Sequence, residues 1–187
     1  MAEKYRDAGY SERNADARVC QDVVLKAIER SNLGRNVTIK GGVVMRSITG
    51  NVRRATEDLD FAYCFDVCMD DEGVSLLINS CEQIFAEKLR SLLRFGPLST
   101  RYKDIFDLCY LKDHVNMSKL VERIKVYIIN EPTMRETDMK SVQKRVSITF
   151  SNRQFRKNVE NSGDRNWLQI DVGIAFGMIL EFLETVA

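Results

Sequence analysis

Residues 38–66 read TIKGGVVMRSITGNVRRATEDLDFAYCFD, and this stretch decides the predicted fold. A short β-type run ends in Gly41-Gly42, and a few residues of helical character follow. A Gly-Gly pair alone indicates only a turn. Its backbone can approach a phosphate closely, however, and the N-terminus of a following helix favours negative charge. The stretch therefore predicts a strand, a phosphate-binding turn and a short helix, in that order.

A pair of carboxylates, Asp58 and Asp60, closes this stretch within the sequence DLDF. Alternate residues of a strand point to the same face, so the two lie about 7 Å apart along the chain. Such a pattern is also common on a solvated strand face, but Leu59 and Phe61 indicate that the opposite face is buried. Two neighbouring carboxylates repel each other unless a cation lies between them, and oxygen ligands suit Mg²⁺. Together with the Gly-Gly turn, the pair predicts a metal-dependent phosphoryl-transfer site.

Composition excludes several other classes of protein. The 187 residues are 44% hydrophobic and carry a formal net charge of +1, so no overall charge attracts nucleic acid or membranes. Five cysteines and a single histidine form no zinc motif, which favours reduced thiols. The polar N-terminus and the lack of a long apolar run predict a cytoplasmic protein with no membrane segment.

Hydrophobic periodicity predicts a β-containing first half and a helical second half. Residues 1–15 are expected to be a frayed arm, and 75–79 fit either a strand or a helical lead-in. The predicted strands are 37–39, 59–63 and 65–69, and the predicted helices are 16–31, 80–93, 102–111, 118–130, 138–150 and 167–186. The inward positions are expected to be Val19, Val23, Val24 and Ile28 in the first helix and Ile84, Phe85, Leu89, Leu92 and Leu93 in the second. We therefore expect an α+β fold, with a small mixed-sheet core in residues 1–80 and a helical bundle in residues 81–187.

Two blocks of sequence resemble one protein family. KGGVVM…RRATEDLDF in residues 40–61 and EQIFAEKLRSLLRFGPLSTRYKDIFDL in residues 82–108 are similar to the AbiEii-like nucleotidyltransferase toxins of the bacterial abortive-infection type E system. These belong to the DNA polymerase beta-like nucleotidyltransferase superfamily. The resemblance implies that the first half is a nucleotidyltransferase core. It further implies Mg²⁺-dependent transfer of a nucleoside monophosphate from an NTP to an RNA or protein acceptor, with an antitoxin as partner.

The resemblance also implies roles for particular residues. Asp58 and Asp60 would hold Mg²⁺, Lys88 would reach a phosphate, and Asp104 would be an essential polar residue near the nucleotide. The nucleotide-binding residues implied are Gly41, Gly42, Lys88, Arg101 and Lys103. Asp107 lies three residues after Asp104, so one helix face presents both. Its reading as a helix-surface or capping residue stays open.

Asp66 resembles the third carboxylate of the superfamily, as a metal ligand or general base, although an ordinary strand-end residue fits too. Only five residues separate Asp60 from Asp66, where the family has a long segment. On one continuous strand their Cα atoms would be about 20 Å apart, too far to share a metal. The tripeptide 62–64 has no residue that favours a hairpin turn. Either the site is shortened and impaired, or the sequence lacks a segment near 63–65, which we favour because both flanking motifs are intact.

The helical half has a basic bias, which fits a solvated surface or a docking face for an RNA acceptor, such as tRNA, or for an acidic partner. The residues are Lys119, Arg123, Lys125, Lys140, Lys144, Arg145, Arg153, Arg156 and Lys157. Two alternative functions stay open. One is a catalytically impaired nucleotide-binding or protein-interaction module of the same fold. The other is a phosphotransferase that moves a terminal phosphoryl group.

Overall fold

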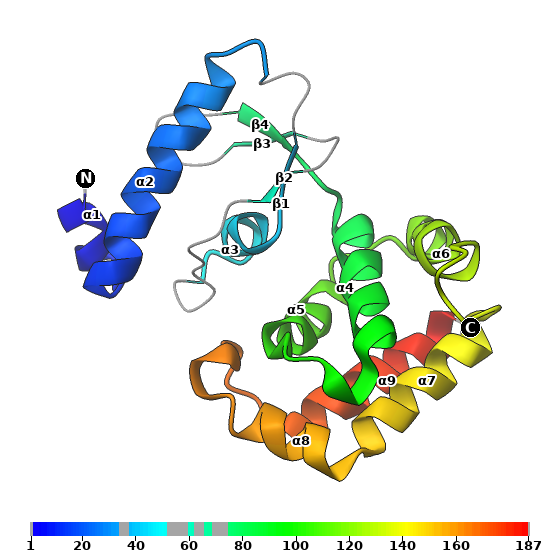
Figure 1. The fold of residues 1–187 in the computed structure, drawn as a ribbon. Coiled ribbons are helices and arrows are strands. Elements are labelled where there is room, and N and C mark those ends of the chain that lie inside the picture. Colours follow the sequence, from blue (N-terminus) through cyan, green and yellow to red (C-terminus); the bar gives the residue numbers. More distant parts are fainter. Residues whose placement is uncertain (1, 34–37, 52–59, 62–65, 69–74, 187) are drawn as a thin grey trace. The chain divides into compact units, whose positions relative to one another are not determined.

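A computed structural model gives the fold of the chain (Figure 1). The structure describes residues 2–33, 38–51, 60–61, 66–68 and 75–186. The chain divides into two compact units, Met1–Ser80 and Cys81–Ala187, which are described separately below. No helix in the described ranges is long and apolar enough to cross a membrane.

The expectation of an α+β fold with a small mixed-sheet nucleotidyltransferase core is wrong. Helix predominates in the described chain, and each strand has only two to four residues. Strands in globular proteins are usually five to six residues long, at about 3.3 Å per residue. Strands this short bury little apolar surface, so helices provide most of the packing.

Four short strands pair within the first unit. Their bounds are β1 Thr38–Lys40, β2 Asp60–Phe61, β3 Asp66–Cys68 and β4 Ser75–Ile78. Their order is β2-β1-β4-β3, with β1 and β4 parallel and both outer strands antiparallel to their neighbours. The ambiguous residues 75–79 thus begin as a strand.

The N-terminal arm is helical, contrary to expectation. Helix α1 (Ala2–Asp7) packs on α2 (Glu12–Glu29), as Figure 1 shows. The Tyr5 hydroxyl donates a hydrogen bond to Asp22, and the Arg18 guanidinium lies over the Tyr5 ring at 5.5 Å. Arg18 also forms an ion pair with Asp22 at 3.1 Å. This polar cluster fixes the first helix on the second.

The same cluster explains why the inward face predicted for α2 is wrong. Arg18, Gln21 and Asp22 are buried, whereas Val23 and Val24 are 55% and 44% exposed. The valines have helical spacing, but the polar side chains that hold α1 occupy the face that packs. Apolar periodicity alone therefore chose the wrong side of this helix.

The second unit is built from helices. Its elements are α4 Cys81–Phe95, η2 Gly96–Leu98, α5 Tyr102–Leu111, α6 Met117–Ile124, the π-helical η3 Lys125–Ile129, α7 Met139–Ser151, α8 Arg153–Glu160, η4 Gly163–Arg165 and α9 Val172–Val186. The helices predicted at 80–93, 102–111 and 138–150 are confirmed. The last helix begins at Val172 and not at residue 167 as predicted. Just before it, the Asp171 carboxylate accepts a hydrogen bond from the Ile174 N–H.

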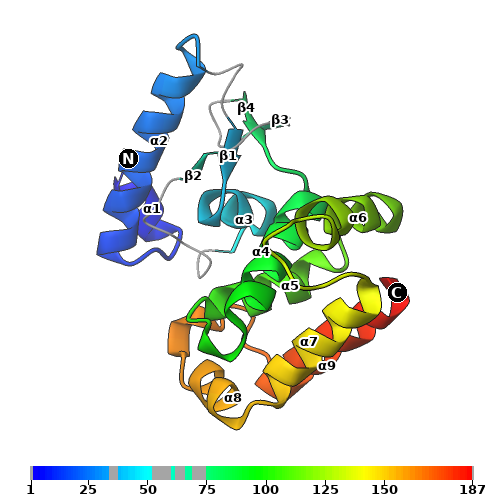
Figure 2. The ribbon, with the colours of Figure 1, turned by 45° about the vertical axis from the view of Figure 1, so that its right-hand side comes forward.

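The core of this unit follows the predicted pattern. All five inward positions of α4 are buried, as are three aromatic residues that bring α7, α8 and α9 together. The rings of Phe150 and Phe176 stack at 4.0 Å, and Phe155 lies 6.0 Å from Phe176. Figure 2 shows α7 and α9 running side by side.

Burial predicts a sharp difference in thiol reactivity between Cys109 and Cys20. Cys109 is 1% exposed, and burial raises the pKa of its thiol to about 12, whereas Cys20 is exposed. Because the thiolate is the reactive form, a maleimide at pH 7.5 is expected to label Cys20 within minutes and Cys109 only after denaturation. Peptide mapping of the native and urea-treated chain measures both. Equal labelling of the two cysteines in the native chain would contradict the packing of α5.

Candidate functional site

The predicted strand, Gly-Gly turn and short helix are present in the first unit. Strand β1 ends at Lys40, and α3 (Gly42–Thr49) begins after Gly41. Gly41 has φ 75° and ψ −144°, a conformation that favours glycine because it has no Cβ. Its carbonyl accepts a hydrogen bond from the Met45 N–H at 3.2 Å. The chain therefore turns directly from strand into helix, leaving the first N–H groups of α3 without helical partners.

The backbone positions of Asp60 and Asp66 lie on opposite outer strands. Asp60 of β2 pairs with Lys40, and Asp66 of β3 pairs with Leu77. Strands β1 and β4 lie between them, and three steps of about 4.8 Å separate the outer strands by about 14 Å. This distance is too long for two aspartates to share one ion. The structure thus does not bring Asp66 to Asp60.

Other parts of the predicted metal site cannot be placed. Asp58 lies outside the described residues, as do residues 62–65, where a missing segment was expected. In the part of the chain that the structure describes, no cluster of three or more His, Cys, Asp or Glu side chains could hold a metal ion.

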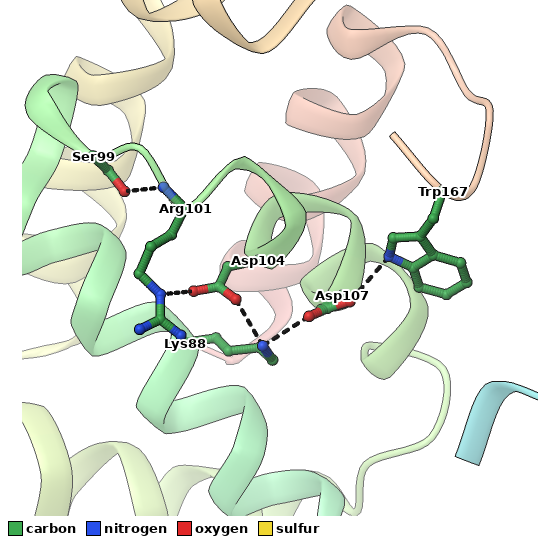
Figure 3. Close-up of polar contacts among 6 residues, drawn as sticks. All are labelled: Lys88, Ser99, Arg101, Asp104, Asp107 and Trp167. Atoms are coloured by element: carbon green, nitrogen blue, oxygen red, sulfur yellow. Dashed lines mark hydrogen bonds and ion pairs between the residues drawn. The ribbon is translucent and has the colours of Figure 1, made fainter. Parts of the chain in front are cut away.

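A network of charged side chains lies between α4 and α5 in the second unit (Figure 3). The Lys88 Nζ of α4 lies 2.7 Å from a carboxylate oxygen of Asp104 and 2.7 Å from one of Asp107. The spacing of three residues places both carboxylates on the face of α5 that meets α4. Lys88 is 5% exposed and Asp104 6% exposed, so these charges are largely removed from water.

The network has an exposed end at Arg101. The Arg101 Nε donates to the second oxygen of Asp104 at 2.7 Å, while the Arg101 side chain is 61% exposed. The backbone N–H of Arg101 donates to the Ser99 hydroxyl. Lys103, beside Asp104 on α5, is half-buried. The network is therefore open to solvent at the Arg101 side chain.

The other end of the network is sealed by Trp167. The indole Nε1–H donates to Asp107 at 3.0 Å, and Asp107 is fully buried. The reading of Asp107 as a surface or capping residue is therefore wrong. Trp167, which lies 60 residues along the chain from Asp107, was not among the site residues predicted from the sequence. Its only local signal was being the single tryptophan of the chain.

Among the described residues, two cations of the network meet two carboxylates. Lys88 therefore places its Nζ between the carboxylates of Asp104 and Asp107. Lysine and arginine are the side chains that most often bind phosphate oxygens, and Arg101 is the exposed one of the two. The arrangement is suited to anion binding at one end and to a structural role at the other.

Comparison with known families decides the classification. A family model described as "Nucleotidyl transferase AbiEii toxin, Type IV TA system" matches residues 65–170, more than half of the chain. The chain belongs to this AbiEii family. No curated protein and no solved structure matches it. The resemblance to AbiEii-like nucleotidyltransferase toxins is thereby confirmed.

The AbiEii match divides the predicted site residues into two groups. Lys88, Asp104 and Asp107 lie inside it, together with Arg101 and Trp167, so the whole network belongs to the family region. The Gly-Gly turn and the Asp58/Asp60 pair precede residue 65 and lie outside it. The family is that of a type IV toxin–antitoxin nucleotidyltransferase.

Proposed function

We propose that this AbiEii chain is a Mg²⁺-dependent nucleotidyltransferase that moves a nucleoside monophosphate from an NTP to an RNA or protein acceptor, releasing pyrophosphate. Its role is that of a toxin controlled by an antitoxin. The observation that carries the proposal is the buried network of Lys88, Asp104 and Asp107, which lies within the family match and opens to solvent at Arg101.

The first unit would supply the metal and the phosphate turn. Asp58 and Asp60 provide an all-oxygen donor pair, which suits Mg²⁺, and the metal when bound neutralises charge on the triphosphate. Gly41 and Gly42 would face the phosphates with backbone N–H groups. Asp66 takes no part in the proposed metal site, because its strand lies at the opposite edge from that of Asp60.

The cations that the proposal assigns to the nucleotide in the second unit lie on α4 and next to and on α5. Lys88 and Arg101 would contact phosphate oxygens, with Lys103 beside them, while Asp104 orients both cations through its two oxygens. Nucleotidyl transfer needs positioning and charge neutralisation more than covalent chemistry from the protein. The residues of the network are of the required types.

The basic surface of α7 and α8 supports an RNA acceptor, such as tRNA. Five exposed cations lie on these helices, and Glu160 is their one acidic residue. The five are Lys140, Lys144, Arg153, Arg156 and Lys157. Phosphate contacts by Lys and Arg dominate the affinity of proteins for nucleic acid, so this face fits an RNA backbone.

The test is a transfer assay with each NTP labelled at the α-phosphate, using total RNA and total protein as acceptors. We expect label in an acceptor and pyrophosphate as product, with Asp58→Ala and Asp60→Ala each losing at least about a thousandfold in rate because metal charge is worth several kcal/mol. Asp113→Ala, an exposed substitution, is the control. Transfer that survives both aspartate substitutions would refute the proposal. In a parallel assay with NTPs labelled at the γ-phosphate, transfer of label to an acceptor would indicate a phosphotransferase.

A non-catalytic nucleotide-binding or protein-interaction module is the second candidate. The observation in its favour is the separation of Asp60 and Asp66 on opposite outer strands, which leaves the metal site without the third carboxylate. Nucleotide binding in calorimetry without release of pyrophosphate would favour this candidate over the enzyme.

A further inference from the structure

Arg46 is a buried arginine without a charged partner in the described structure. It is the fifth residue of α3 and is 5% exposed. Among the described residues, neither its Nε nor its Nη2 has a hydrogen-bond partner. Thr38, which begins the strand on which α3 packs, is also fully buried, and its hydroxyl oxygen has no hydrogen-bond partner in the described ranges.

This arrangement is costly in the absence of an anion. A guanidinium stays protonated at any ordinary pH, so burial cannot be relieved by losing the charge. Burying a charge removes its hydration free energy, and without a partner no ion pair or hydrogen bond compensates for that loss. Arg18 of the same unit offers a comparison: its Nε and Nη1 also lack hydrogen bonds, but the Asp22 carboxylate balances its charge at 3.1 Å. The described residues provide no such balance for Arg46.

The geometry of the helix gives the direction in which Arg46 extends. Cα–Cβ bonds in an α-helix tilt toward its N-terminus, so a long side chain covers the preceding turn. The preceding turn of α3 starts at Gly41-Gly42, where the first backbone N–H groups lack helical acceptors. The positive end of the helix dipole and the guanidinium therefore act on the same space.

We propose that Arg46 is the side-chain cation of an anion-binding site at the N-terminal end of α3, and that the anion is a phosphate group. Its fork of N–H donors matches the oxygens of a phosphate, which can also accept from the Gly42 and Val43 N–H groups. The assignment of that phosphate to a nucleotide substrate rests on the proposed function. The site itself requires only binding.

The test compares Arg46→Met with wild type in the full chain, with EDTA present so that no metal contributes. Thermal unfolding and calorimetry are measured with ATP, GTP, CTP, UTP, pyrophosphate and inorganic phosphate as separate ligands. We expect wild type to be stabilised by at least one of these, and Arg46→Met to raise its Kd tenfold or more. Without ligand, Arg46→Met should unfold at the same or a higher temperature than wild type, because methionine removes a buried charge that no described residue balances.

Arg18→Met is the matched control, since it removes the buried arginine that has a carboxylate partner. It should lower the unfolding temperature and leave the Kd unchanged. The proposal is overturned if Arg46→Met unfolds at a lower temperature, as Arg18→Met does, and binds every ligand as wild type does. That result would mean that a carboxylate of the chain balances Arg46.

Comparing the separate ligands shows which kind of phosphate compound the site binds. Stabilisation by NTPs and pyrophosphate, but not by inorganic phosphate, identifies a polyphosphate site, whereas inorganic phosphate alone identifies a free-phosphate site. Both depend on Arg46 if the proposal holds. The measurement needs no turnover, so a loss of binding in Arg46→Met supports the site even if nucleotidyl transfer is never observed.

Discussion

Replacing Asp107 with leucine is expected to lower the free energy of unfolding of the helical unit by about 3–5 kcal/mol. Asp107 is fully buried, lies 2.7 Å from the Lys88 ammonium and accepts the Trp167 indole N–H. The substitution removes one of the two carboxylates that pair with Lys88 among the described residues, which weakens the compensation of a buried positive charge. It also takes a hydrogen-bond acceptor from the indole.

The measurement is urea unfolding followed by tryptophan fluorescence, with far-UV circular dichroism as a second probe. The chain has one tryptophan, and that residue contacts Asp107 directly, so its emission reports on this unit. Asp113→Leu is the control because the Asp113 side chain is 65% exposed and pairs only with a neighbouring lysine in the described structure. Exposed pairs contribute at most about 1 kcal/mol, so the control should change little.

A double substitution separates charge imbalance from loss of packing. Lys88→Met with Asp107→Leu replaces both charged partners with apolar groups of similar length. Buried ion pairs replaced in this way often recover stability, so the double variant should be more stable than Asp107→Leu alone. If Asp107→Leu and Asp113→Leu had the same urea midpoint, the network shown in Figure 3 would have no structural role.

The helices of the second unit could be predicted because their apolar residues recur at 3.6-residue spacing. The five inward positions of α4 illustrate this, since all are buried against neighbouring helices. In α2 the same spacing predicts the wrong face, because Arg18 and Asp22 pack inward and Val23 faces solvent. The buried face of α2 is the one whose polar side chains contact Tyr5 of α1. The spacing of apolar residues within α2 alone cannot predict a contact with another helix. Similarly, apolar runs predicted strands but not that each would be too short to form a core.

The candidate site was predictable only where its residues lie close together in sequence. Lys88, Arg101 and Asp104 belong to one block of residues 82–108, which the family match includes. Trp167 reaches the network from outside that block, through a contact that the tertiary fold alone creates. Arg46 was missed for a different reason: an arginine in a short helix is usually exposed, and its burial shows only in three dimensions.

Replacing Phe176 with alanine is expected to lower the free energy of unfolding of the same unit by about 3–5 kcal/mol. Phe176 of α9 is 2% exposed, and its ring stacks on Phe150 of α7 with an interplanar angle of 5°. The Arg156 guanidinium of α8 lies 5.4 Å from the centre of the Phe176 ring. The Phe176 side chain thus contacts α7 and α8 from α9. Truncating it leaves a cavity among these three helices, because closely packed helices relax only partly to fill it.

Phe95→Ala and Phe176→Leu show which property of the ring matters. Phe95 is 52% exposed, so Phe95→Ala removes a similar ring with only about half of its area buried and should cost about half as much as Phe176→Ala. Phe176→Leu keeps most of the volume but loses the stacked ring, and should cost about 1–1.5 kcal/mol. The fluorescence of Trp167 again follows unfolding. Equal midpoints for Phe176→Ala and Phe95→Ala would mean that α9 is not packed on α7 and α8 as described. A leucine variant as unstable as the alanine variant would assign the effect to aromatic contacts rather than to the cavity.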